Sequence, residues 1–147
     1  MKTAIVYVST HHGNTKRLVD AIEAKHEVTL IDGTAQNEVN LEEYDLIGYA
    51  SGIAYGKFYP EMLEFMEKNA PANKKVFFMH TSGNPFDRYD NAAKAICEGR
   101  NCENLGTYFC KGFDTFGALK LVGGIAKGHP TDEEIEGAVE FFEGLEK

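Results

Sequence analysis

The sequence predicts an α/β protein, a three-layer sandwich in which a five-stranded parallel sheet carries helices on both faces. Along its 147 residues, apolar strand-like runs alternate with amphipathic helix-like runs, and this alternation is typical of parallel sheets joined by helical crossovers. The first and fourth runs are continuously apolar, as expected for strands that are covered on both faces. Five such strands allow the order 2-1-3-4-5, whose switch point lies between strands one and three.

Each expected strand is a short run rich in β-branched and aromatic residues. The five runs cover residues 2–8, 28–32, 45–50, 75–80 and a stretch near 106–110. The crossover between the second and third runs, residues 33–43, is short and polar. The helix of this crossover is therefore predicted to be a single turn or absent.

Helices are expected in the other crossovers and at the end of the chain, because apolar residues recur there at 3.6-residue spacing. The last helix has a capping-box pattern, Thr131 with Glu134, just after Pro130. Pro60 suits the first turn of the helix that follows the third strand. The residues predicted to face the core are Leu18, Val19 and Ile22; Met62, Leu63 and Met66; Ala92, Ala93, Ile96 and Cys97; and Ile135, Ala138, Val139, Phe142 and Leu145.

The loop between the first strand and the first helix is the leading candidate for an anion site. Backbone N–H groups at a helix start have no intrahelical partners, and the helix dipole adds partial positive charge there. Hydroxyl and amide side chains supply further donors, so a phosphate fits without Lys or Arg. The alternative is an ordinary turn capped by Asn or Thr. The loop consists of Ser9, Thr10, His11, His12, Gly13, Asn14 and Thr15.

Two further loops, residues 51–59 and 81–89, are expected at the same edge of the sheet, where ligands of this fold bind. The first holds three aromatic residues and the second begins with small ones. Exposed aromatics gather where they cover something apolar, and small residues allow the backbone to approach a ligand closely. The alternatives are packing against the next helix and helix capping. The candidate residues are Ser51, Gly52, Ala54, Tyr55, Gly56, Lys57, Phe58, Thr81, Ser82, Gly83 and Asn84.

A family resemblance supports this interpretation. Gly13-Asn14-Thr15 resembles the second half of the phosphate loop of flavodoxins, roughly Ser/Thr-x-Thr-Gly-x-Thr, with His12 where the family usually has Thr. The segment 51–58 resembles short-chain flavodoxins of anaerobes, as does the segment 112–117. The resemblance implies a flavodoxin-like fold and bound FMN, held by the first loop and enclosed by the other two. It makes Tyr55 or Phe58, together with residues 81–83, candidates to flank the flavin ring.

Charge and cysteine content narrow the functional classes. The net charge of −8 argues against nucleic acid and suits transient docking with basic redox partners, although it also serves solubility. Three cysteines without a C-x-x-C pattern fit reduced thiols in a cytoplasm. No run is long enough to span a membrane. We expect a single domain over residues 1–147, a monomer and no metal.

The resulting functional hypothesis is an FMN-binding electron carrier with no catalytic residues of its own, because the flavin supplies the chemistry. A dinucleotide is not expected, since the Gly-x-Gly-x-x-Gly fingerprint is missing. Two alternatives remain open, a small FMN-dependent NAD(P)H or quinone oxidoreductase and a non-flavin signalling domain. The candidate loops carry Lys57 and Arg88 against Asp87 alone, which predicts a less negative reduction potential than in a flavodoxin whose loops are acidic.

Overall fold

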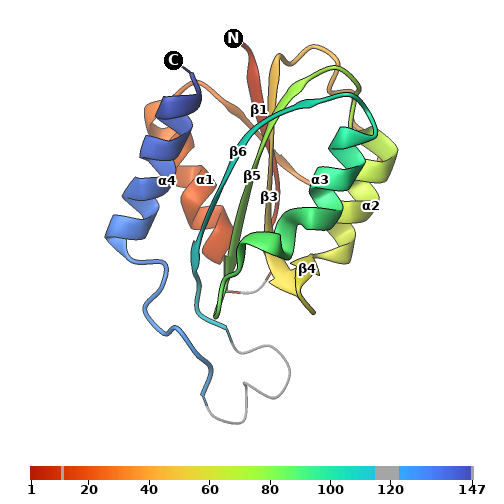
Figure 1. Cartoon of the computed structure of the whole chain (residues 1–147). Helices are drawn as coiled ribbons and strands as arrows, with labels where there is room; N and C mark the ends of the chain where they lie inside the picture. Colours follow the sequence, from red (N-terminus) through yellow and green to blue (C-terminus); the bar gives the residue numbers. More distant parts are fainter. Residues whose placement is uncertain (11, 115–122, 147) are drawn as a thin grey trace.

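The computed structural model describes residues 1–10, 12–114 and 123–146. Five strands pair in parallel in the order β2-β1-β3-β5-β6. Counted along the chain without the short β4, this is the predicted order 2-1-3-4-5, which confirms the predicted fold (Figure 1). The strands are β1 (Thr3–Val8), β2 (Thr29–Asp32), β3 (Leu46–Ala54), β4 (Lys57–Phe58), β5 (Lys75–Ser82) and β6 (Glu103–Lys111).

Helices cover both faces of the sheet (Figure 1). One face carries α1 (Asn14–Lys25) and α4 (Asp132–Leu145), and the other carries α2 (Pro60–Asn69) and α3 (Asn91–Glu98). A short 3-10 turn, η1 (Asp87–Asp90), precedes α3. Residues 33–43, all of which the structure describes, form turns and no helix. The prediction that this crossover has no helix is therefore confirmed.

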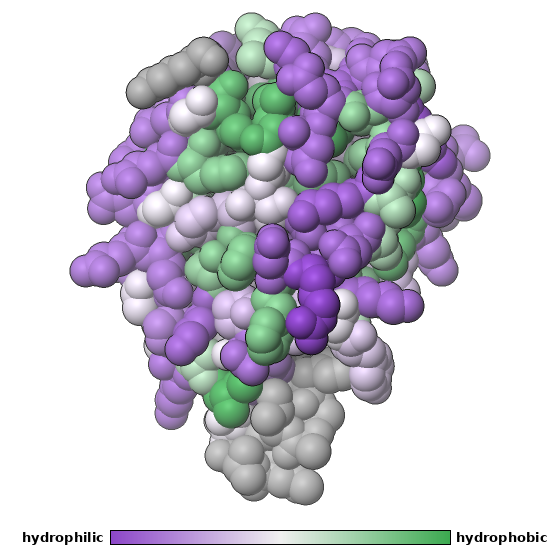
Figure 2. Space-filling view, in the orientation of Figure 1, coloured by the Kyte–Doolittle hydropathy of each residue, from purple (hydrophilic) through white to green (hydrophobic). Residues whose placement is uncertain are grey.

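The sheet separates two apolar clusters. Successive side chains of a strand point to opposite faces, so β1 contributes Val6 to the cluster beneath α2 and α3 and Ile5 to the cluster beneath α1 and α4. β6 forms an edge of the sheet, and its central residues are partly exposed. Figure 2 shows apolar patches mixed with weakly polar ones in the middle of the view, over this edge strand, and mostly polar helix surfaces beside them.

Two strands extend beyond their predicted ends and thereby shape the site. β3 continues through residues 51–54, and β5 continues through Thr81 and Ser82. Parallel pairing between them continues as far as Gly52 and Thr81. The beginnings of both candidate loops are therefore strand, which fixes their backbone.

Candidate functional site

The three predicted loops meet at the carboxyl edge of the sheet, around a narrow crevice with a free volume of about 10 Å³, roughly the space of one water molecule. Six of its lining residues were predicted site residues: three from the first loop, one from the second and two from the third. The other five are Ile53 at the end of β3, Tyr59 just after β4, and three residues of the segment that follows β6. The lining residues are Ser9, Asn14, Thr15, Gly52, Ile53, Tyr59, Thr81, Ser82, Gly112, Phe113 and Asp114.

The first loop presents the start of α1 to this edge. Gly13 is the residue before the helix, and its φ is +65°. Because Gly13 has no side chain, the N-cap position itself donates no side-chain cap to the helix. The hydroxyl of Ser9 instead accepts a hydrogen bond from the N–H of Lys16, at 3.0 Å. Neither Asn14 nor Thr15 is the residue that caps the helix, because both lie inside its first turn. Their own N–H groups lie outside the helical ladder and suit an anion.

Two side chains of the first loop make contacts with other parts of the chain. The Thr15 and Thr81 hydroxyl oxygens are 2.9 Å apart in a buried position, which ties the first loop to β5. One hydroxyl donates to the other, so the accepting one keeps its own O–H for a further partner. The Asn14 side-chain amide donates to the carbonyl of Phe113 at 2.8 Å. An anion here would therefore be held mainly by backbone.

The second predicted loop is a β-hairpin. β4 pairs back onto β3, with Ile53 opposite Phe58, through a two-residue turn in which Tyr55 and Gly56 have φ +54° and +75°. Two positive φ values are the signature of a type I′ turn. Tyr55 is 89% exposed at the tip. The Ser51 hydroxyl anchors the base of the hairpin by accepting the N–H of Tyr59 at 3.1 Å.

The two residues suggested as flavin neighbours differ in this hairpin. Phe58 is 1% exposed, and its ring lies 6.4 Å from Phe78 and 5.9 Å from His80, centroid to centroid. Core packing is therefore the role the structure gives Phe58. Tyr55 and Lys57 are exposed, and Ala54 is partly buried. Of the two aromatic candidates, Tyr55 is the one that can reach a ligand.

The third loop supplies a buried polar atom and close backbone packing. The Ser82 hydroxyl has no hydrogen-bond partner among the described residues. A Cβ at Gly83 would lie 2.5 Å from Ile125 and 2.9 Å from Asp114, and one at Gly52 would lie 2.6 Å from the Tyr59 ring. A side chain at either position would force these neighbours to move. Asn84, the last predicted residue, is exposed.

The sequence analysis missed the role of the segment after β6. A Cβ at Gly112 would lie 2.7 Å from the Asn14 amide, and the Phe113 ring lies 4.4 Å from the His12 ring. Gly112 and Phe113 belong to the segment that resembled flavodoxins, but residues 115–117 of that segment lie outside the described residues, as does His11. Arg17 was also missed, and its guanidinium donates to the carbonyl of His12 at 3.2 Å.

Two titratable groups under the hairpin are shifted by burial. His80 is fully buried, and neither ring nitrogen has a hydrogen-bond partner in the described part of the chain. Burial lowers the pKa of His80 to about 4, so the ring is neutral near pH 7 and stacks on Phe109 at 5.0 Å. Burial raises the pKa of Tyr59, an effect that a hydrogen bond with Thr10 partly offsets.

Comparison with known proteins agrees with this geometry. The sequence model of the flavodoxin domain matches residues 5–106. The chain belongs to the flavodoxin family. A protein of Methanocaldococcus jannaschii, MJ0298, is 36% identical over 151 residues, covering 100% of this chain and 99% of the relative.

Two solved structures share the flavodoxin fold. Flavodoxin 2 from Bacillus cereus has a TM-score of 0.71 at 19% identity, over 99% of this chain and 98% of that one. The general stress protein 14 from Treponema denticola, solved in complex with FMN, has a TM-score of 0.67 at 13% identity, over 99% of both chains. These likenesses extend the family assignment to the overall fold.

No group of three or more His, Cys, Asp or Glu side chains among the described residues could hold a metal ion. None of the described helices combines the length and the apolar character needed to cross a membrane.

Proposed function

We propose that this chain binds FMN at the carboxyl edge of the sheet and carries electrons between redox enzymes. The observation that carries the proposal is the start of α1, where Gly13 leaves the helix without a cap of its own. Asn14 and Thr15, the first residues of this helix, line the same crevice as Ser82, whose buried hydroxyl has no hydrogen-bond partner among the described residues. A phosphate on the first loop and a polar ring edge near Ser82 would satisfy both groups of donors.

Each part of the site has a separate role in this proposal. The N–H groups of Asn14 and Thr15 hold the phosphate, and the Arg17 guanidinium adds positive charge beside the loop. Tyr55 covers the flavin ring from the hairpin tip. Bound FMN supplies the one-electron chemistry. No side chain is assigned a catalytic role, which separates an electron carrier from an enzyme with its own acid, base or nucleophile.

Comparing FMN with riboflavin tests the site, because riboflavin lacks the phosphate. Flavin-free protein is titrated with each ligand while the flavin fluorescence is followed. We expect FMN to be quenched at concentrations at which riboflavin is not, because only FMN can use the first loop. Equal affinities would contradict a phosphate site at the first loop. A protein that purifies colourless and quenches neither ligand would overturn flavin binding.

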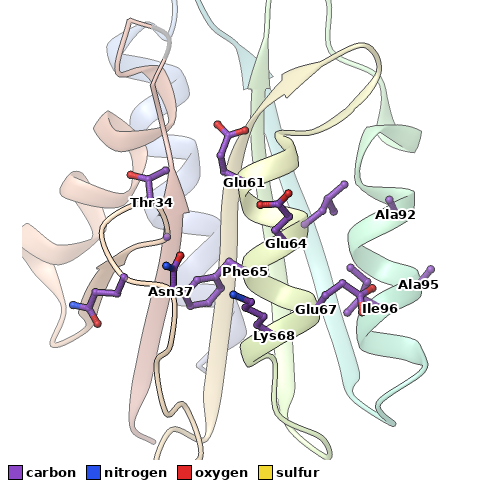
Figure 3. Close-up of a pocket in the computed structure, with 13 residues that line it drawn as sticks. Thr34, Asn37, Glu61, Glu64, Phe65, Glu67, Lys68, Ala92, Ala95 and Ile96 are labelled. Carbon is purple, nitrogen blue, oxygen red and sulfur yellow. The ribbon is translucent and has the colours of Figure 1, made fainter.

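We further propose that basic redox proteins dock beside α2. A groove of about 940 Å³ runs along this helix, between residues 33–37 and α3. Its apolar lining includes Leu63 and Ile96, and Figure 3 shows Glu61, Glu64 and Glu67 along the same helix. A neighbouring hollow shares Glu61, Leu63 and Glu64 and extends to Tyr55. A partner seated there would lie next to the flavin.

Electron transfer to cytochrome c, a basic haem protein, tests this docking surface. Changing Glu61, Glu64 and Glu67 together to Gln should slow the reaction at low salt, because electrostatic attraction speeds encounter. Changing three exposed glutamates on the opposite face should slow it less, although the net charge changes equally. Equal slowing would contradict a specific surface. These control residues are Glu23, Glu136 and Glu140.

The alternative is an FMN-dependent oxidoreductase acting on NAD(P)H and a quinone. Steady turnover of NADH with a quinone, by the flavin-loaded protein alone, would favour it over the carrier. We expect reduction by NADH to be slow, because no described side chain is assigned to bind a nicotinamide. The three free cysteines support a reducing compartment, and we place the protein in the cytoplasm as a monomer.

A further inference from the structure

The C-terminus of α3 brings two cysteines together. The N–H of Cys102 donates to the carbonyl of Cys97 at 3.1 Å, and the N–H of Asn101 donates to the carbonyl of Glu98 at 3.1 Å. Asn101 has φ +58°. These two bonds around a left-handed residue form a Schellman motif, which places the side chains at its two ends in contact. Those two ends are Cys97 and Cys102.

The two thiols differ in exposure. Cys97 is 2% exposed and belongs to the cluster beneath α2 and α3, whereas Cys102 is partly exposed and packs against that cluster. The backbone bond from Cys102 to Cys97 holds these two residues at the two ends of one turn, and the Cys102 thiol donates to the carbonyl of Pro71 at 3.4 Å. Cys110, the third cysteine, lies in the other cluster. The chain therefore contains one thiol pair and a separate buried thiol.

We infer that Cys97 and Cys102 form a redox-active dithiol that closes to a disulfide when it meets a small-molecule disulfide. This goes beyond the proposed electron transfer and does not depend on flavin binding. The competing explanation is that both residues serve only as small apolar side chains of the Schellman contact.

In the proposed thiol–disulfide exchange, the more exposed Cys102 reacts before the buried Cys97. The Cys102 thiolate attacks one sulfur of the small disulfide, breaking its S–S bond and releasing one small thiolate, which takes up a proton. Cys97 then loses its proton to solvent and attacks the sulfur of Cys102, releasing the second small thiol. The protein loses two electrons and two protons, and the small disulfide gains both. Burial raises the pKa of Cys97 to about 12, so Cys97 is protonated near pH 7 and the more exposed Cys102 is the first to attack.

Closure would stabilise the junction between two helices. Arg100 lies between the two cysteines, and its guanidinium donates to the carbonyl of Ala70, beyond the end of α2, at 2.8 Å. A disulfide across this turn would hold α3 to the segment that carries Arg100. We expect oxidation to raise the melting temperature without changing flavin affinity, since neither cysteine lines the candidate site.

Oxidised glutathione provides the test, applied to the folded protein as purified. Trypsin cleaves after Lys94, Arg100 and Lys111, so Cys97 and Cys102 fall on different peptides. We expect oxidation to remove two of the three thiols and to join these peptides, with the loss of two hydrogens and no glutathione attached. Cys110→Ser should give the same linked peptides, which excludes pairing through Cys110.

The second variant separates the two steps. Cys97→Ala removes the resolving thiol, so glutathione should remain attached to Cys102, and far-ultraviolet circular dichroism checks that the variant is folded. Should it not fold, the peptide map of the Cys110→Ser protein decides alone. Lasting glutathione on Cys102 of the unmutated protein, or three unreacted thiols in the folded state, would overturn the inference.

Discussion

The first loop and the hairpin lie at the same edge of the sheet but use their residues in opposite ways. In the first loop the side chains of Asn14 and Thr15 contact other parts of the chain, which leaves the backbone to face a ligand. In the hairpin the backbone is paired, and Tyr55 extends from its tip. A backbone site tolerates side-chain changes that keep its shape. The hairpin, in contrast, can change ligand contact through single side chains.

The largest expected effect separates the two aromatic residues of the hairpin. Phe58→Ala should lower the free energy of unfolding by about 3–5 kcal/mol, because it leaves a cavity in the core. Tyr55→Ala should change it by no more than about 0.5 kcal/mol, as exposed positions do, yet weaken FMN binding. Urea unfolding of flavin-free protein measures both. Similar losses of stability in the two variants would contradict the exposure difference.

In the first loop, Thr15→Ala should lower the free energy of unfolding by about 1–3 kcal/mol, because it leaves the buried Thr81 hydroxyl without a partner. Thr15→Ser retains the hydroxyl and is the control. Urea unfolding in the absence of flavin measures the structural part, and FMN titration then measures any further loss. A variant that loses affinity but no stability would show that the hydroxyl serves the ligand.

Acid should weaken the support beneath the hairpin through His80. Its pKa is about 4 in the folded protein and about 6.5 when unfolded. The unfolded chain therefore binds more protons between these values, and stability is lost as the pH falls from about 6.5 to about 4. Asp90 and Asp87 favour the charged ring and Lys94 opposes it, but burial outweighs them.

This pKa shift corresponds to a loss of about 2 kcal/mol in the free energy of unfolding between pH 7 and pH 5. Urea unfolding at the two pH values gives the loss for the natural protein and for His80→Phe, which cannot titrate at this position. Each protein is compared only with itself, so a change in overall stability does not matter. An equal pH dependence in both proteins would assign the loss to other groups.

The alternation of strand-like and helix-like runs predicts the parallel sheet, and the spacing of Thr131 and Glu134 predicts the capping box that begins α4. The sequence does not distinguish Tyr55 from Phe58, since both are aromatic and lie three residues apart. The register of the hairpin determines which of the two is buried, because it places Phe58 opposite Ile53. The hairpin itself was missed because Tyr-Gly is not one of the usual type I′ pairs.

The contact of Asn14 with Phe113 spans 99 positions of sequence, and no local pattern encodes it. The same holds for Arg17, because its position in the helix does not predict its hydrogen bond to the carbonyl of His12. The Gly112–Phe113 signal was present as a resemblance, but only the folded chain shows that this segment lines the crevice.

The smallest expected effect concerns the exposed cation of the hairpin. Lys57 lies next to the turn on β4, and a positive charge near the ring favours the anionic, fully reduced flavin. Lys57→Ala should therefore make the potential of the last electron more negative. Because water screens an exposed charge, we expect a shift well below the roughly 59 mV that corresponds to about 1.4 kcal/mol for one electron. Lys75→Ala removes an exposed charge at the opposite end of β5 and is the matched control. Potentiometry on both variants decides, and a potential that stays constant or rises in Lys57→Ala would show that Lys57 has no part in setting it.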